Sequence, residues 1–450
     1  MRVEKMRREA DLHCNDMIIM YHRILIMSEK LNMSKETWAS QNSFILPITE
    51  INVITELEQL LHENGSINVY DAIPHFISKY NTDRSDANIS FSVENNTVVA
   101  LSLRYCALTS LPASIGQLTN LALLDMTGNL LTTLPETLGN LFHLRKLYID
   151  DNQLTTLPIS LRNLHHLEEI HMDRNRLSVL PESIVQLTKL KILNVYGNQL
   201  ASVPLNFGAL ASLQEVSVGK NQLTSLPEAL WKLTGLQVLN VAENRIAFIS
   251  ERIGNLTSLS TLDLAHNALT SLPEALGNLT NITFFLYLSN NHLTFLPESI
   301  GNLSKLIYLN ATDNHLTSLP DTIGNFIYLK ELRLYNNVLT TLPESIGNLT
   351  SLRELHLMNN KLTSLPESIG NLTSLRQLDL RNNNLVALPA SLANLVNLTH
   401  LDLRGNRLVV LPEWIGELPR LEKLDLRWNK LAPYPGWLLR LEQRGCTVFK

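Results

Sequence analysis

The apolar positions of this chain recur in a fixed order along most of its length. Between Leu352 and Leu372, leucine and isoleucine alternate with polar residues in one pattern, which restarts at Leu375, Leu398 and Leu421, every 23 residues. A period of about 20–50 residues is typical of stacked repeat proteins. The length of 450 residues therefore reflects the number of repeats in one elongated body rather than several closed globular cores.

Fifteen repeats start at the same position of this pattern. They begin at Val98, Leu121, Leu144, Leu167, Leu190, Leu213, Leu236, Leu259, Ile282, Leu306, Leu329, Leu352, Leu375, Leu398 and Leu421. We therefore divide the chain into a helical N-terminal region or cap (1–97), an array of 15 units (98–435) and a C-terminal cap (436–450). Within the last segment, Trp437–Leu441 is expected to form a helical turn and Cys446–Phe449 a terminal strand.

Within each repeat the pattern predicts a short strand, a turn and a return path. Leu355–Leu357 places two leucines inward and a histidine outward, as in a half-buried strand. The amide of Asn360 is expected to bond backbone groups of its own and the adjoining turn, and Cys106 stands in this column in the first repeat. Pro366 fixes the backbone where the chain rounds to the opposite side. Gly370 is expected to open a short helical or 3-10 turn.

One strand per repeat, always in the same direction, predicts an α/β solenoid, a curved horseshoe with a parallel β-sheet on its concave side. Because neighbouring strands lie only about 4.8 Å apart and the helical or 3-10 turns are bulkier, these turns are expected on the convex side. Two repeats depart from the pattern. Ser250 replaces the proline of one, and another has one extra residue between Ile282 and Leu286, where we expect a local bulge.

The order Leu-x-x-Leu-x-Leu-x-x-Asn-x-Leu resembles the leucine-rich repeat family over about three quarters of the chain. The segment Leu-Pro-x-x-Ile-Gly-Asn-Leu, as at Leu365–Leu372, is most similar to intracellular Ras-group repeat scaffolds and to repeat effectors that intracellular bacterial pathogens inject into host cells. This resemblance implies a protein-binding scaffold whose candidate partners are small GTPases and signalling complexes. Some such effectors carry a ubiquitin-ligase domain after the repeats, and the sequence up to Lys450 leaves no room for one.

The residues before Val98 predict helices. Apolar residues at helical spacing predict one over 3–31, a second over Ile48–Glu63 and a third from about Val69 to Tyr80, followed by a polar linker or extended cap over 81–92. Six of the nine methionines lie in the first 33 residues, as in an adaptable partner-binding helix. The alternative is a cap over the open apolar end of the first repeat, which we favour because an uncapped solenoid end is insoluble.

Net charge and cysteine content argue against some classes of function and some cellular locations. A net charge of −5 and a pI near 6.2 argue against nucleic-acid binding through a basic field. Cys14, Cys106 and Cys446 are too few and too far apart for disulfide-bonded end caps, which favours a cytoplasmic location. A bacterial effector would be secreted into the host cell cytosol. The apolar run Met17–Met27 is interrupted by charge and too short to span a bilayer, so no membrane span is expected.

Outward strand positions vary between repeats whereas inward positions hardly vary, so the outward positions are available for recognition. They form three zones: an acidic patch of Asp150, Asp151 and Asp173, a central tyrosine and arginine mixture typical of hot spots, and a C-terminal zone of aspartates and arginines. In the last zone, mutual salt bridging and a partner site are both open interpretations. The predicted partner-binding residues are Tyr148, His171, Tyr196, Tyr287, Tyr308, Arg333, Tyr335, Glu354, His356, Met358, Asp379, Arg381, Asp402, Arg404, Asp425 and Arg427.

The sequence gives no sign of catalytic chemistry. No Gly-x-Gly-x-x-Gly or Walker pattern occurs, and glycine recurs about once per repeat, as turns require. His266, His292 and His315 come from three successive repeats and could approach one another around a transition metal, but no carboxylate or cysteine accompanies them. Cys14 and Cys446 have no histidine partner nearby in sequence. We therefore expect no catalytic residue, cofactor or metal.

The sequence is compatible with two functions. The first is a non-enzymatic scaffold, expected as a monomer, that binds a protein partner on its concave face. The alternative is an adaptor in which residues 1–97 recruit a ubiquitin ligase or another enzymatic machine while the repeats hold the substrate.

Overall fold

The computed structural model describes residues 46–63, 89–431 and 433–450. The chain forms two compact units, of which the first ends at Gln222 and the second begins at Leu223. The helices predicted over 3–31 and from about 69 to 80 lie outside the described residues. Within the described ranges, no helix is both long and apolar enough to cross a lipid bilayer.

Helix α4 (Ile48–Glu63) has the predicted bounds. Its residues Leu57 and Leu61 are fully buried, and the helix packs against the 3-10 turn of the first repeat. Glu50 is buried as well, and its carboxylate accepts a hydrogen bond from the backbone N–H of Val98 at 2.8 Å. Burial raises the pKa of Glu50. The helix therefore covers the apolar end of the first repeat, as a cap does.

An antiparallel hairpin follows, made of β1 (Ile89–Glu94) and β2 (Thr97–Leu103). Asn95 and Asn96 form its turn with φ of 49° and 59°, a left-handed conformation that asparagine tolerates better than most residues and that suits a two-residue hairpin loop. Strand β1 begins inside the segment 81–92, so that residues 89–92 are strand rather than linker.

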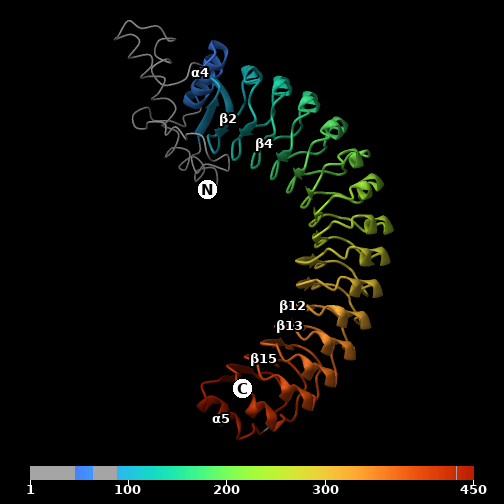
Figure 1. Cartoon of the computed structure of the whole chain (residues 1–450). Helices are drawn as coiled ribbons and strands as arrows, with labels where there is room; N and C mark the ends of the chain where they lie inside the picture. The colour runs from blue at the N-terminus through green and yellow to red at the C-terminus, as the bar shows by residue number, and fades with distance from the viewer. Residues whose placement is uncertain (1–45, 64–88, 432) are drawn as a thin grey trace. The chain divides into compact units, whose positions relative to one another are not determined.

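A short strand then recurs once per repeat, parallel to its neighbours within each unit (Figure 1). In the first unit β2 is followed by β3 (Leu123–Asp125), β4 (Lys146–Tyr148), β5 (Glu169–His171), β6 (Ile192–Asn194) and β7 (Glu215–Ser217). The second unit contains β8 (Val238–Asn240), β9 (Thr261–Asp263), β10 (Phe285–Tyr287), β11 (Tyr308–Asn310), β12 (Glu331–Arg333), β13 (Glu354–His356), β14 (Gln377–Asp379), β15 (His400–Asp402), β16 (Lys423–Asp425) and β17 (Thr447–Phe449). Equivalent residues of successive repeats pair directly, as Leu332, Leu355 and Leu378 do.

A 3-10 turn carries the chain back in every repeat but the last, on the side opposite the strands (Figure 1). In the first unit the turns are η1 (Ala113–Gln117), η2 (Glu136–Asn140), η3 (Ile159–Asn163), η4 (Glu182–Gln186) and η5 (Phe207–Ala209). In the second unit they are η6 (Glu228–Lys232), η7 (Glu251–Asn255), η8 (Glu274–Asn278), η9 (Glu298–Asn302), η10 (Asp321–Asn325), η11 (Glu344–Asn348), η12 (Glu367–Asn371), η13 (Ala390–Asn394) and η14 (Glu413–Glu417). Within each unit the strands line the inner side of the curve and the turns its outer side.

The asparagines that recur once per repeat form a hydrogen-bonded ladder, as predicted. The Asn360 side chain accepts a hydrogen bond from the N–H of Leu339 at 3.0 Å and donates to the carbonyls of Leu334 and Leu357, both at 3.0 Å. Each asparagine thus satisfies buried backbone groups of its own and the preceding repeat, where no water can reach them. Cys106 in the same column is fully buried.

The glycine that recurs in most of these turns, such as Gly370, serves packing rather than turn formation. Turn η12 begins at Glu367, and Gly370 is its fourth residue rather than its opening residue. A Cβ added to Gly370 would lie 2.3 Å from the carbonyl oxygen of Ser391 in the next repeat. The expectation that these glycines serve turn formation is therefore wrong here, because Gly370 lacks a left-handed φ and is needed for the close approach of successive turns.

Ser250 occupies the position before turn η7 at which other repeats have proline. Its φ of −63° is close to the proline value, and its hydroxyl accepts a hydrogen bond from the N–H of Arg252 at 3.3 Å. Serine can therefore replace proline here because it both adopts the required backbone conformation and caps the following turn.

The extra residue of the ninth repeat is taken up before its strand. The backbone bends at Phe284, whereas Phe285 pairs directly with Thr261 on one side and Tyr308 on the other. The extra residue thus lies ahead of β10, and the ladder keeps its register on both sides of this strand instead of forming the expected bulge.

The predicted helical turn and terminal strand are both present after the last repeat. Helix α5 (Leu438–Gln443) buries Leu438 and Leu441, and β17 pairs in parallel with β16. The apolar side of the last repeat is therefore covered by its own C-terminal segment.

Candidate functional site

Each strand presents outward residues on both sides of its buried leucine. In β12, Glu331 and Arg333 flank Leu332, which is fully buried, and Tyr335 follows two residues later. The register places Arg333 beside Asn310 on one side and His356 on the other. The repeat spacing therefore converts residues 23 positions apart into lateral neighbours on one face.

Four aromatic side chains, three on β10 and β11 and one directly before β10, form a contiguous group, the aromatic cluster of Phe284, Phe285, Tyr287 and Tyr308. The ring of Phe285 lies 5.6 Å from that of Tyr287 and 5.7 Å from that of Tyr308, and the two tyrosine rings are 5.5 Å apart. Phe284 and Phe285 remain 55% and 40% exposed. A contiguous group of partly exposed aromatic side chains is typical of interaction sites.

Arg333 extends the aromatic cluster with a cation. Its guanidinium carbon lies 5.4 Å from the centre of the Tyr308 ring, within the range of a cation–π interaction. Burial raises the pKa of Tyr308 to about 12, so this phenol stays neutral and able to donate a hydrogen bond at physiological pH.

Polar side chains of β12 and β13 adjoin Arg333. Arg333 Nε donates a short hydrogen bond to Glu331 Oε1, and His356 Nε2 lies 3.2 Å from Glu354 Oε2 and 3.8 Å from Glu331 Oε1. Tyr335 is half-buried at the end of the same face. The structure thus brings together all the central residues that the sequence predicted, apart from Met358 in the next zone.

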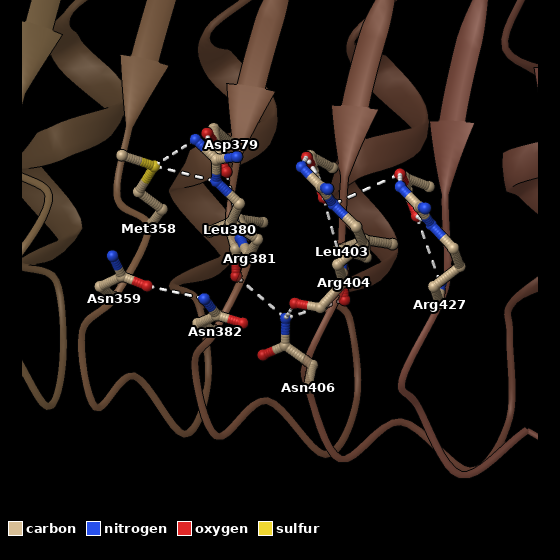
Figure 2. Close-up of polar contacts among 12 residues, drawn as sticks. Met358, Asn359, Asp379, Leu380, Arg381, Asn382, Leu403, Arg404, Asn406 and Arg427 are labelled. Atoms are coloured by element: carbon tan, nitrogen blue, oxygen red, sulfur yellow. Dashed lines mark hydrogen bonds and ion pairs between the residues drawn. The ribbon is translucent and has the colours of Figure 1, made fainter. Parts of the chain in front are cut away.

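The C-terminal zone consists of internal salt bridges (Figure 2). Asp379 and Arg381 are 3.2 Å apart, Asp402 and Arg404 2.5 Å, and Asp425 and Arg427 2.6 Å; in each pair the aspartate ends a strand and the arginine follows two residues later. Arg404 also reaches Asp425 on the next strand at 3.3 Å. Burial alone would raise the pKa of Asp425, but hydrogen bonds from Arg427 and the charge of Arg404 outweigh it and lower that pKa. The mutual salt bridging considered from the sequence is therefore present.

Met358 lies against this zone rather than in the aromatic cluster. Its sulfur is 2.9 Å from Arg381 Nε, and Figure 2 shows the guanidinium turned toward it. The thioether is a weak acceptor, so it positions the arginine without neutralising it.

In the first unit, Tyr148 and His171 pack edge to face with ring centres 4.9 Å apart. The Tyr148 hydroxyl donates to Glu169 Oε2 at 2.6 Å, and the backbone N–H of Tyr196 donates to the carboxylate of Asp173 at 2.7 Å. The three predicted residues of this unit therefore lie on one strand face, but they are distributed over successive strands beside polar partners.

The acidic patch of the first unit is largely neutralised. Asp150 is buried and accepts a hydrogen bond from the N–H of Asp173 at 2.7 Å, whereas Asp151 pairs with Arg174 through two contacts of 2.6 and 2.7 Å. Burial raises the pKa of Asp150 to about 7 and also raises the pKa of Asp173. These carboxylates consequently offer a partner less negative charge than their number suggests.

Asp150 gives the chain a specific pH dependence. Folding raises the pKa of this carboxyl from 3.8 to about 7, so the folded chain binds a proton that the unfolded chain has lost, and stability falls as the pH rises through this window. An amide cannot ionise, so the Asp150→Asn variant does not lose stability in this way. Its free energy of unfolding relative to that of the unsubstituted chain is therefore expected to rise by about 2 kcal/mol from pH 5 to pH 8. Urea midpoints at the two pH values measure this gain, and Asp151→Asn is the control. An equal pH response of both variants would contradict it.

Two groups were missed by sequence reasoning. Phe284 and Phe285 belong to the repeat with the extra residue, from which only Tyr287 was predicted to bind a partner. Glu331 occupies a third outward column, two residues before the column of Arg333, and the 23-residue spacing to Glu354 would have revealed it. Among the described residues, His266, His292 and His315 do not bring three donor atoms together. The rings of His292 and His315 instead stack with their centres 5.6 Å apart.

The family models agree with this architecture. The model of the leucine-rich repeat region matches residues 136–246, 284–363 and 345–433, and that of the leucine rich repeat matches 96–154 and 234–293. Because these matches cover more than half of the sequence, the chain belongs to the leucine-rich repeat family. No curated protein sequence matches it.

Solved structures give closer points of comparison. A leucine-rich repeat protein of Leptospira interrogans is similar at 36% identity and a TM-score of 0.70, covering 76% of this chain and 86% of that one. The plant peptide hormone receptor RGFR1, in complex with RGF2, has 27% identity and a TM-score of 0.60, covering 72% and 57%. YopM from Yersinia enterocolitica has 27% identity and a TM-score of 0.55, covering 75% and 70%. Repeat proteins of this family serve as protein-binding scaffolds.

Proposed function

We propose that this chain is a non-enzymatic scaffold that binds a protein partner on the outward face of strands β10 to β13. The observation that carries the proposal is the aromatic cluster, in which Phe284 and Phe285 are about half-exposed beside two packed tyrosines. Large aromatic side chains next to an arginine supply most of the binding energy in many interfaces because they bury much area with little loss of conformational entropy.

The neighbouring residues extend this surface. Arg333 and His356 lie beside each other in adjacent strands, and Tyr335 stands on the same face. The salt-bridged zone around Arg404 would form a polar rim, because its charges already have partners and gain little from a second one. The complex of RGFR1 with RGF2 supports the use of this fold for peptide or protein binding.

The kind of partner follows from resemblance. The repeat motif at Leu365–Leu372 favours small GTPases or signalling complexes as partners, and similarity to repeat proteins of Leptospira and Yersinia favours a bacterial effector that acts in the host cell cytosol. The adaptor alternative receives less support, because α4, within residues 1–97, uses its apolar side to cover the first repeat.

Replacing Phe285, Tyr287 and Tyr308 together with alanine is expected to weaken partner binding by roughly 30-fold or more, since hot-spot residues contribute about 2 kcal/mol or more. An affinity pull-down from lysate first identifies the proteins held by the unsubstituted chain, and binding is then measured with the purified partner. Phe248 and Phe295 are 67% and 52% exposed but lie outside the strands, so their double alanine variant is the matched control. Unchanged affinity in the triple variant would refute this binding surface.

A further inference from the structure

Three side chains on β12 and β13 bring metal-ligating atoms together. His356 Nε2 lies 3.2 Å from Glu354 Oε2 and 3.8 Å from Glu331 Oε1, and one donor atom of each residue lies within 4.8 Å of the others. All three side chains are partly shielded, with 20% to 36% of their surface exposed. Across the described part of the chain, Glu331, Glu354 and His356 are the group of three side chains whose possible metal-ligating atoms come this close together.

The sheet holds these donors in place. Glu331 and Glu354 are direct partners in adjacent parallel strands, and His356 follows Glu354 by two residues on the same face of β13. Neighbouring strands are spaced about 4.8 Å apart, so the backbone fixes the separation of the side-chain origins. Sites built on strands position ligands more accurately than sites built on loops.

We propose that Glu331, Glu354 and His356 bind one divalent transition-metal ion, with Zn²⁺ as the best-suited ion. Zinc is bound by histidine nitrogen and carboxylate oxygen at about 2.0–2.2 Å, which places tetrahedral ligands roughly 3.3–3.6 Å from one another. The distances of 3.2 and 3.8 Å bracket this value. One nitrogen and two carboxylates disfavour Mg²⁺ and Ca²⁺, which take oxygen ligands. Three protein ligands would leave a fourth position for water or for a donor from a bound molecule.

Arg333 is the competitor for this site. Its Nε donates to Glu331 Oε1, and its guanidinium lies against the Tyr308 ring. A metal ion and this arginine would share one carboxylate oxygen, so metal binding requires Glu331 to exchange one cation for another. Removing the arginine charge should therefore strengthen metal binding, which would not hold for an ion adsorbed elsewhere.

The test uses the full chain, freed of metal with a chelator. Zn²⁺ is titrated in competition with a chromogenic chelator, and Co²⁺ absorption in the visible range reports the coordination geometry. We expect one Zn²⁺ per chain, a loss of affinity of about tenfold or more in Glu354→Gln and in His356→Gln, and a gain of severalfold in Arg333→Met. The Co²⁺ spectrum should disappear in His356→Gln.

His400→Gln is the matched control. His400 lies on β15 in the same outward column as Glu354, and its Nδ1 contacts Thr399 Oγ1 at 2.9 Å rather than a carboxylate pair. Its loss should leave zinc affinity unchanged. Equal affinity of the unsubstituted chain, Glu354→Gln and His356→Gln would overturn the proposal. Circular dichroism verifies the fold of each variant. If one of them is unfolded, the Zn²⁺ affinity of Glu331→Gln is measured instead, and an affinity equal to that of the unsubstituted chain would likewise overturn the proposal. The readout of this test is metal binding alone. A negative result would therefore not contradict the proposed protein-binding surface, and a negative result in the protein-binding test would not contradict the metal site.

Discussion

Replacement of Asn383 by alanine is expected to destabilise the chain by about 3 kcal/mol or more. The Asn383 side chain accepts a hydrogen bond from the N–H of Leu362 at 3.1 Å and donates to the carbonyls of Leu357 and Leu380, both at 3.0 Å. It is buried, so alanine would leave the N–H of Leu362 without a partner in a place that excludes water, whereas the carbonyls of Leu357 and Leu380 would each keep one hydrogen bond, from Asn360 and Asn406. The unpartnered donor costs about 1–3 kcal/mol, and each of the two lost hydrogen bonds adds about 0.5–1.5 kcal/mol. The shift of the urea midpoint measures the loss.

The adjacent Asn384 provides the matched control. Its backbone N–H donates to the carbonyl of Leu362, a bond that alanine keeps, and its side chain is half-exposed. Asn384→Ala is therefore expected to change stability by less than about 0.5 kcal/mol. Asn383→Asp separates the effect of side-chain size from that of hydrogen bonding. Aspartate keeps the shape and the acceptor of asparagine, but it replaces the donating NH2 group with an oxygen that faces two carbonyls. Equal midpoints of the Asn383 and Asn384 alanine variants would contradict the ladder as a source of stability.

The ladder could be predicted because it depends only on residue type and period. An asparagine such as Asn360, buried beyond a short strand, has few partners other than backbone groups, and repetition every 23 residues makes the partner the adjoining repeat. The same period indicates which outward residues are neighbours. It assigned Tyr287 and Arg333 to one face, and the structure places them there.

The pairing of the outward charges could not be predicted in the same way. Alternating aspartate and arginine, as at Asp402 and Arg404, is compatible with an open binding site and with internal salt bridges. Side-chain rotamers decide between the two, and the period carries no information about them. Two members of the aromatic cluster, Tyr287 and Tyr308, were predicted, whereas Phe284 and Phe285 were missed: Phe285 shares the outward column of Tyr308, and Phe284 belongs to the stretch with the extra residue, for which no column exists.

The physical reason for the glycine column also lay outside the sequence. Glycine recurs in most turns, but Arg162, Val185, Trp231 and Ala393 occupy the column in other repeats. A recurring glycine is compatible with a left-handed backbone or with close packing. Only the distance between neighbouring turns distinguishes these causes, and that distance depends on how two repeats pack.

Replacement of Gly347 by alanine should therefore act through overpacking. The added Cβ would lie 2.4 Å from the carbonyl oxygen and 2.7 Å from the Cβ of Ser368 in the following turn. Since both atoms belong to a packed neighbour, η11 and η12 must separate to accommodate a methyl group. Overpacking of this kind costs about 1–3 kcal/mol, which thermal and urea unfolding would detect as a lowered midpoint.

Gly235 distinguishes packing from a general effect of removing glycine. A Cβ at this position would meet no atom within 4 Å, and its φ is not left-handed. Gly235→Ala is expected to stabilise the chain by about 0.4–1 kcal/mol, because alanine restricts the unfolded backbone without strain in the folded one. The two substitutions are chemically identical and differ only in what surrounds the new methyl group. Opposite shifts of the midpoint would establish turn-to-turn contact as the reason for glycine, and a stabilised Gly347→Ala would refute it.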